Sequence, residues 1–281
     1  VIIDSHCHVW RRWPYQPPVP DPNRRATVDQ LYYEMNLHGV EQAVIICARV
    51  NDNRNNNDYV ARAAQASGGR LHPFFDLDSC WLDTHHKPGA SRRLKHLIRQ
   101  YPIRGITHYL RRDDDGDWLN GEEAHALFEV IAEHGLVFSL SCYPRQHAAI
   151  RALAGRFASV PILCHHLAHI SPQPRQRAHD LKQVCRSAEL ENIHIKVSGF
   201  AYCSQTRWAF PYDDAVEVFR RLYEHYGARR MCWGSDYPVV RKYATYEQAL
   251  ELVRTHCDFL SKQDRAWILG KTMASLLDRS R

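Results

Sequence analysis

Three stretches of the sequence combine residue types and spacings that could build a metal centre or a hydrolytic site. The first is IIDSHCHVW at residues 2–10, in which one residue separates His6 from His8. Side chains alternate across a β-strand, so these two imidazoles would share one face and could bind the same ion. The alternative is a pair of hydrogen-bonded histidines with a structural role, and the pattern alone leaves both interpretations open.

The second stretch is CHHLAH at residues 164–169, which contains His165, His166 and His169. Adjacent residues of a strand point to opposite faces, so we expect at most one of His165 and His166 to face inward. The sequence does not decide which of the two it is. His169 is expected in the loop that follows.

The third stretch is WGSDYP at residues 233–238, in which Asp236 follows a Gly-Ser pair. A carboxylate in this position could bind a metal ion, take a proton from a metal-bound water, or do both in turn. The structural alternative is an aspartate that caps the next helix.

The elements that would position these residues follow a regular alternation. Short apolar runs rich in Val, Ile and Phe predict eight strands, at 1–6, 42–48, 71–77, 103–110, 137–143, 161–168, 193–199 and 231–238. Apolar spacings of three and four predict helices at 27–38, 58–67, 90–100, 121–134, 145–156, 177–190, 213–226 and 245–258, with a last helix at about 262–278. Eight strand–helix units predict a single (β/α)8 TIM barrel over residues 1–281, ahead of an open doubly wound sheet.

A barrel of this kind would bring the three stretches together, because its chemistry lies at the C-terminal ends of the strands. Strands 1, 6 and 8 would then direct His6, His8, one histidine of strand 6 and Asp236 toward one point. A divalent ion held there would lower the pKa of its bound water toward 7 and polarise a carbonyl.

Together, IDSHCH, PILCHHLAH and MCWGSDYPV resemble the amidohydrolase superfamily, and more narrowly its amidohydrolase-2 branch of metal-dependent TIM-barrel hydrolases. In that branch strand 1 carries DxHxH, strand 6 reads roughly DHLGKP and strand 8 reads GSDWP. The closing ILGKTMASLL (268–277) resembles the last helix of the branch, and the resemblance covers the whole chain. It implies a lactonase-like hydrolase with metal ligands His6, His8, His166 and Asp236, of which Asp236 and His166 are also catalytic.

The sequence departs from the pattern of the branch at several positions. His165 replaces the Asp of DHLG, Ala168 and His169 replace the Gly and Lys, and Thr272 replaces the Asn of the closing helix. Strand 4 offers no Lys or Glu clearly placed to bridge two ions. We therefore expect one divalent metal ion, with zinc as the first choice, or a metal-independent site, since the branch contains members of both kinds.

The resemblance predicts hydrolysis of a lactone, either of a sugar acid or of an aromatic-degradation dicarboxylate, with Asp236 as the general base. The alternative is a metal-dependent non-oxidative decarboxylase or hydratase on the same scaffold. Strand 5, VFSLSCY, lacks the histidine that decarboxylating members of the superfamily often use as a ligand. Its absence argues against the decarboxylase alternative. A barrel that has lost catalysis and only binds a ligand is a third hypothesis.

Residues just past the strand ends, and in the first loop, are candidates for substrate binding. Arginine suits a substrate carboxylate because its guanidinium can donate two parallel hydrogen bonds. The predicted substrate-binding residues are Trp10, Arg49, His108, Tyr109, Arg111, Arg112 and Tyr143. For each of them a surface or packing role is the alternative.

Composition narrows the classes of partner and location. The formal net charge is +6, but the arginines are spread along the chain rather than gathered in a patch, so we expect an anionic small molecule rather than a nucleic acid. No apolar run reaches the roughly 18 residues of a membrane span. The nine cysteines show no CxxC pairing, which favours reduced thiols and a cytoplasmic location. A homo-oligomer is left open.

Overall fold

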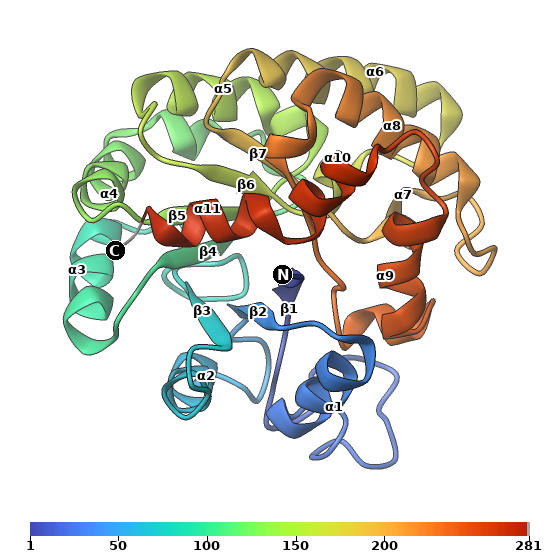
Figure 1. The fold of residues 1–281 in the computed structure, drawn as a ribbon. Helices are drawn as coiled ribbons and strands as arrows, with labels where there is room; N and C mark the ends of the chain where they lie inside the picture. The colour runs from blue at the N-terminus through green and yellow to red at the C-terminus, as the bar shows by residue number, and fades with distance from the viewer. Residues whose placement is uncertain (280–281) are drawn as a thin grey trace.

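The computed structural model describes residues 1–279 and confirms the predicted single (β/α)8 TIM barrel (Figure 1). Eight strands pair in parallel in the order of the sequence, from β1 to β8. They are β1 (Ile3–Cys7), β2 (Gln42–Cys47), β3 (Leu71–Asp76), β4 (Gly105–Tyr109), β5 (Val137–Ser141), β6 (Ile162–Cys164), β7 (Ile193–Val197) and β8 (Met231–Trp233). Seven of them lie within the predicted runs, and β1 extends one residue past its run, to Cys7, so the apolar runs located the strands well.

Helices surround the barrel (Figure 1). They are α1 (Val28–His38), α2 (Asn56–Gln65), α3 (Ala90–Gln100), α4 (Glu122–Glu133), α5 (His147–Arg156), α6 (Pro174–Arg186), α7 (Phe200–Cys203), α8 (Asp213–Tyr226), α9 (Tyr246–Thr255), α10 (Lys262–Ala266) and α11 (Thr272–Asp278). Short 3-10 helices lie in the loops, including η1 (Asp117–Asn120), η3 (His166–His169) and η6 (Val239–Lys242). Helix α7 and the 3-10 helices were not predicted, because single turns carry no apolar periodicity.

The last predicted helix, 262–278, is divided in the structure. Helix α10 is followed by a π-helical turn, Trp267–Lys271, and then by α11. Gly270 lies in this turn against the start of the chain, where a Cβ would be 2.3 Å from the carbonyl oxygen of Val1. Glycine therefore permits the close approach of the two backbones.

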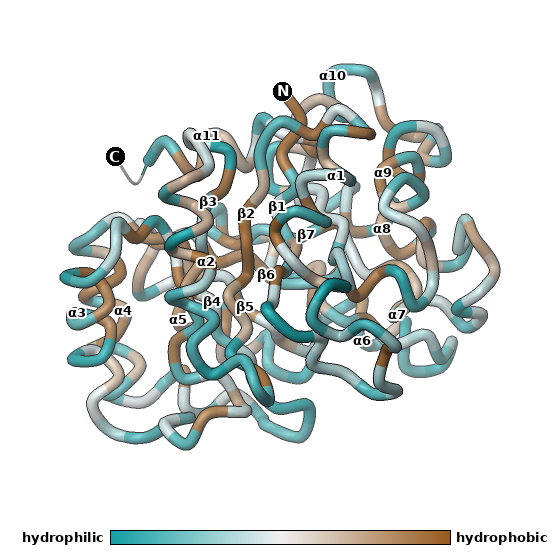
Figure 2. Tube along the Cα trace, turned by 90° about the horizontal axis from the view of Figure 1, so that it is seen from below, coloured by the Kyte–Doolittle hydropathy of each residue, from teal (hydrophilic) through white to brown (hydrophobic). Residues whose placement is uncertain are grey.

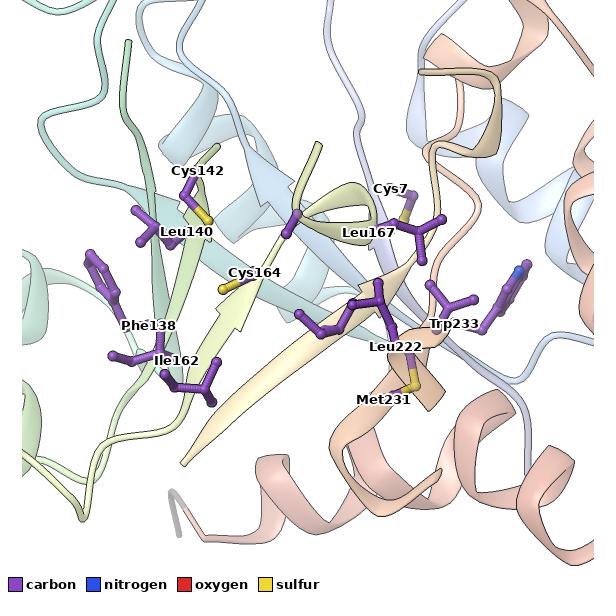
Figure 3. Close-up of a cluster of buried hydrophobic side chains, with 14 of the residues drawn as sticks. Cys7, Phe138, Leu140, Cys142, Ile162, Cys164, Leu167, Leu222, Met231 and Trp233 are labelled. Atoms are coloured by element: carbon purple, nitrogen blue, oxygen red, sulfur yellow. The ribbon is translucent and has the colours of Figure 1, made fainter. Parts of the chain in front are cut away.

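The apolar residues form two layers. Inside the barrel, Ile3, Val44 and Phe74 pack with residues of α11 such as Met273 and Leu277, so α11 closes the N-terminal end of the barrel. The larger layer lies between strands and helices, and Figure 3 shows part of it on β5 and β6. Figure 2 agrees, since brown stretches follow the central strands and teal prevails at the periphery. Over residues 1–279, no helix combines the length and apolarity needed to cross a membrane.

The barrel closes through residues that follow β8 rather than through β8 itself. The amide of Asp236 donates to the carbonyl of His6 at 2.8 Å, and that of His8 donates to Tyr237 at 2.6 Å. Cys7 forms an isolated parallel bridge with Tyr237. The seam of the barrel and the predicted site are therefore built from the same two segments.

His147 is a buried histidine of the outer layer, and it begins α5. Its Nδ1 lies 2.9 Å from the Ser187 hydroxyl. Burial, with a smaller effect of Arg151, lowers the pKa of His147 from 6.5 to about 3. The folded chain therefore holds this ring neutral at pH values where the unfolded chain protonates it.

We expect this difference to make the protein less stable in acid. The contribution of the neutral ring is complete above pH 6.5 and is lost as the pH falls toward 3, by about 1.4 kcal/mol per pH unit. In His147→Gln, the free energy of unfolding in urea should depend less steeply on pH over that range. The matched control is His179→Gln, whose side chain is 62% exposed on α6. Equal slopes in His147→Gln and wild type would contradict the assignment.

Candidate active site

The structure brings together the four residues predicted to bind a metal ion. The Nε2 atoms of His6, His8 and His166 lie 3.6, 3.5 and 3.9 Å from Oδ1 of Asp236. All four residues are buried, with exposed fractions of 5% or less. One carboxylate oxygen thus faces three imidazole nitrogens at the C-terminal end of the barrel.

The pairing of β1 is irregular where it carries the first histidine of the centre. The pairing of β1 with β2 shifts between Asp4 and Cys7. His6 within this stretch and His8 after it both face Asp236, as the predicted alternation requires, while Asp4 turns to the seam and binds Ser235. A bulge of this kind commonly redirects side chains near a functional site.

The expectation that at most one of His165 and His166 faces inward is wrong. Both rings contact the His6 ring, with centroids 4.5 and 4.4 Å away. Strand β6 ends at Cys164, and residues 166–169 have positive φ values, so strand alternation no longer applies. His165 lies 2.7 Å from the Ser139 hydroxyl of β5, through Nε2, while His166 turns toward Asp236.

Asp236 does not have the role of a helix cap. The next helix, η6, has Pro238 at its N-cap, and Asp236 Oδ2 instead accepts a hydrogen bond of 2.5 Å from the Tyr202 hydroxyl. The residue has φ +59°, a conformation that costs energy outside glycine and recurs at functional sites. Just before it, Gly234 lies so close to β1 that a Cβ would be 2.6 Å from the Cβ of His6.

The charges at the centre suit a cation. Burial alone would raise the pKa of Asp236, but His166, His8 and the hydrogen bond from Tyr202 outweigh it and hold the pKa below its usual value. Burial lowers the pKa of His166 to about 4 and that of His6 well below 6.5. At neutral pH the centre therefore holds an ionised Asp236 and neutral imidazoles at His6 and His166, as metal binding requires.

Hydrogen bonds at Nδ1 decide where the lone pairs point. Nδ1 of His8 lies 2.9 Å from the carbonyl oxygen of Ile46, which can only accept, so Nδ1 carries the proton. In the neutral ring, the lone pair is then on Nε2, which faces Asp236. Nδ1 of His166 lies 3.0 Å from the Ser198 hydroxyl, and Nε2 of His6 is buried without a hydrogen-bond partner.

Lys196 of β7 is a buried residue of the centre that the sequence interpretation missed. Its Nζ lies 3.3 Å from Nδ1 of His6, and burial lowers the pKa of Lys196 to about 8. A neutral Lys196 amine accepts a hydrogen bond from Nδ1–H and leaves the His6 Nε2 lone pair free, whereas the ammonium donates a hydrogen bond to Nδ1 and the ring proton is then on Nε2. A lysine within the apolar run IHIKVSG was the available signal, because lysine is rarely buried without a role.

Tyr202 and Ser198 were also missed. Both follow β7, where Ser198 contacts His166 and Tyr202 donates to Asp236. Tyr202 lies in the four-residue helix α7, which has no sequence signature of its own. Gly199, at φ +65°, was the only local sign of the sharp turn before it.

An open cavity of about 780 Å³ lies beside the centre. It reaches Tyr202, which binds Asp236, and His169, whose ring contacts His166 at 5.1 Å. Two predicted substrate-binding residues line it, Arg112 and Tyr143. The remaining lining is Asp113, Pro144, Arg145, Ser171, Pro172, Gln176, Asp180 and Arg207.

The other predicted substrate-binding residues lie elsewhere. Trp10 is fully buried and stacks on His8 at 4.8 Å, and Tyr109 contacts the His165 ring at 5.2 Å, so both support the histidines. Arg49 lines a separate groove at α2 and α3, where its Nε donates to the carbonyl of Arg54.

His108 and Arg111 also lie apart from the centre. His108 is adjacent to Tyr109 on β4 and faces the opposite way, toward Trp118 and the carbonyl of Leu77. Arg111 is exposed after β4 and lies outside the lining of the cavity.

Known proteins resemble this chain over almost its whole length. A family model described as Amidohydrolase matches residues 3–279. An L-fucono-1,5-lactonase from Burkholderia ambifaria is 27% identical over 293 residues, which cover 95% of this chain and 92% of that protein.

Two solved structures bear on the fold. An amidohydrolase from Burkholderia multivorans with bound zinc has a TM-score of 0.79, 20% identity and 99% coverage of both chains. A protein from Acinetobacter baumannii, described as a probable 2-pyrone-4,6-dicarboxylic acid hydrolase and solved with citric acid, has a TM-score of 0.76, 19% identity and 99% coverage of both chains.

The hydrogen bond from His8 to Ile46 predicts an unusual tautomer that can be observed directly. In protein with ¹⁵N-labelled histidine, two-dimensional NMR at about pH 8 should show the proton of His8 on Nδ1. His8→Gln assigns the signal by removing it. A proton on Nε2, or on both nitrogens, would contradict the assignment of the free lone pair of His8 to Nε2.

Proposed function

This chain belongs to the amidohydrolase family, and on that premise we propose that it hydrolyses a lactone at the end of the barrel that carries Asp236. The observation that carries the proposal is the single oxygen Oδ1 of Asp236, which faces Nε2 of His6, His8 and His166 within 3.9 Å. Ester hydrolysis needs an activated water and a polarised carbonyl, and this arrangement can provide both. The relative that is an L-fucono-1,5-lactonase supports the reaction class.

The same residues fit one divalent metal ion. His6, His8 and Asp236 each offer a ligand atom within 4.8 Å of the others, and the buried Nε2 of His6 has no hydrogen-bond partner. We propose that these residues, with His166, hold the ion, and that it is zinc, as in the Burkholderia multivorans structure. When bound, such an ion supplies Lewis acidity and lowers the pKa of a water.

Asp236 acts as the general base of the reaction and then as its general acid. Tyr202 occupies Oδ2, so Oδ1 remains to take a proton from the attacking water. The water oxygen bonds to the lactone carbonyl carbon and forms a tetrahedral intermediate. When this collapses, the bond to the ring oxygen breaks, and Asp236 returns the proton to that oxygen as it becomes a hydroxyl.

The cavity beside the centre favours a substrate that carries a carboxylate. Three guanidinium groups, of Arg112, Arg145 and Arg207, line it with only two carboxylates. One of these, Asp180, already accepts hydrogen bonds from the Ser171 amide and the Gln176 side chain. The Acinetobacter baumannii structure, solved with citric acid, supports an anionic ligand. We therefore propose a lactone with an acidic substituent, ahead of a neutral sugar lactone.

Replacement of the base should abolish turnover. In Asp236→Asn we expect kcat/KM for the best lactone substrate to fall by about 10²- to 10⁴-fold, because the amide cannot accept the proton. Hydrolysis is followed by proton release with a pH indicator across a panel of lactones. The control is Asp213→Asn, an exposed carboxylate at the start of α8, which should keep wild-type activity. Wild-type turnover in Asp236→Asn would exclude the mechanism.

Decarboxylation is the competing reaction, and an assay run in parallel with the lactone panel tests it. Carboxylic acids of the same size as the lactones are incubated with the enzyme, and the CO2 released from them is compared with the ring opening of the lactones. Release of CO2 that requires Asp236, with no ring opening, would replace the lactonase proposal by the decarboxylase alternative.

Arg112 should determine preference for acidic substrates. In Arg112→Gln we expect KM for a carboxylated lactone to rise about five- to tenfold, less than a buried ion pair would give, because Arg112 is exposed. KM for a neutral aldonolactone should not change. Arg111→Gln is the matched control, since Arg111 is the exposed neighbour outside the cavity lining. An equal rise in KM in both variants would show that the positive charge of this region, rather than the position of Arg112 in the cavity, sets the preference.

A further inference from the structure

A second cluster of histidines lies outside the proposed site. His85 and His86 come from the loop between β3 and α3, and His108 comes from β4. One ring nitrogen of each lies within 4.8 Å of the others. Trp118 of η1 covers the cluster and stacks on His86 at a centroid distance of 4.5 Å and an angle of 6°.

Hydrogen bonds fix the tautomers of two of these rings. Nδ1 of His85 lies 2.8 Å from the carbonyl oxygen of Asp78, and Nδ1 of His108 lies 2.9 Å from that of Leu77. A carbonyl can only accept, so both Nδ1 atoms carry a proton, and in the neutral form of each ring the lone pair is on Nε2. Metal-binding histidines are typically held in this way by a hydrogen bond at the other nitrogen.

The Nε2 atoms of all three rings are buried and have no hydrogen-bond partner. His108 is only 1% exposed, so its free lone pair is costly unless something binds it. Burial lowers the pKa of His108 to about 4 and that of His86 to about 3, which keeps both rings neutral. On the other side of His86, Nδ1 lies 3.6 Å from a carboxylate oxygen of Asp114.

We propose that His85, His86 and His108 form a second metal site, for a divalent ion of the zinc type. Three neutral imidazoles are a ligand set that zinc accepts, with a fourth position left for water. Nitrogen ligands of a tetrahedral zinc ion lie about 3.3 Å apart. The ligand atoms of the cluster lie within 4.8 Å of one another, and His85 and His86 are only partly buried, so their rings can adjust on binding.

The site is separate from the proposed active site. His108 lies on the face of β4 opposite Tyr109, and Tyr109 is the residue that contacts His165. An ion here would join the loop after β3 to β4. That loop is already held at one end, where Arg93 pairs with Asp78 at 2.7 Å, and His86 adopts φ +53° within it. The second site would thus hold this loop in place rather than act on the lactone.

The competing explanation is a stack of aromatic rings with no ligand role, since His85 and His86 stack at 3.7 Å. His86→Phe separates the two explanations, because phenylalanine keeps the stack on Trp118 but has no nitrogen. His86→Asn is a second variant, since asparagine tolerates a positive φ. His179→Phe, at an exposed position of α6, is the control for loss of a histidine.

The experiment counts ions. Each protein is stripped of metal, dialysed against Zn²⁺ and analysed for bound zinc per chain. We expect wild type and His179→Phe to bind one ion more than His86→Phe and His86→Asn. Equal zinc content in wild type and both His86 variants would overturn the proposal.

Tryptophan fluorescence then locates the ions. Trp118 stacks on His86 and Trp10 stacks on His8, so each reports a different histidine set. Added Co²⁺ should quench the wild-type emission more than that of Trp118→Phe. The proposal fails if Co²⁺ quenches Trp118→Phe as much as wild type but quenches Trp10→Phe less, because only the central site would then bind metal.

Discussion

The structure depends on one buried carboxylate at the seam of the barrel. Oδ1 of Asp4 accepts hydrogen bonds from the amides of Ser235, at 2.9 Å, and His6, at 3.1 Å, and Oδ2 accepts from the hydroxyls of Ser235, at 2.5 Å, and Tyr246, at 3.1 Å. Burial raises the pKa of Asp4 to about 6, and these hydrogen bonds oppose the shift. One side chain thereby joins β1, the segment after β8 and α9. Loss of it would leave buried donors unpaired in all three, which is costly.

The distance between the base and the histidines follows from this seam. Ser235, bound to Asp4, immediately precedes Asp236, and His6 donates its amide to the same carboxylate. Gly234 allows the two backbones to meet, since any Cβ there would overlap His6. Two hydrogen bonds hold Asp236 at its strained φ. Its amide donates to the carbonyl of His6, and its side chain accepts from Tyr202. Closure of the barrel and the geometry of the centre therefore depend on the same contacts.

The sequence predicted the features that follow from the periodicity of strands and helices. It did not predict the positions of side chains in segments without such periodicity. Apolar runs located all eight strands, and alternation placed His6 and His8 on one side. His165 and His166 both turn to the centre because the backbone leaves the strand conformation after Cys164. Tyr202 lies in a single helical turn, and its contact with Asp236 spans 34 residues, which no local pattern encodes.

The two histidine sets differ in the charge they offer a cation. In both, a backbone carbonyl holds Nδ1 of at least one ring and leaves Nε2 free, a distinction that histidine content alone cannot reveal. Only the central set includes an ionised carboxylate aimed at the same point, since Asp114 lies beside Nδ1 of His86 rather than beside the free nitrogens. Asp236 offsets part of the charge of a divalent ion, so the central set is the stronger electrostatic site. It is also the set in which a carboxylate oxygen can serve both the cation and a water proton, and chemistry therefore belongs there rather than at the second cluster.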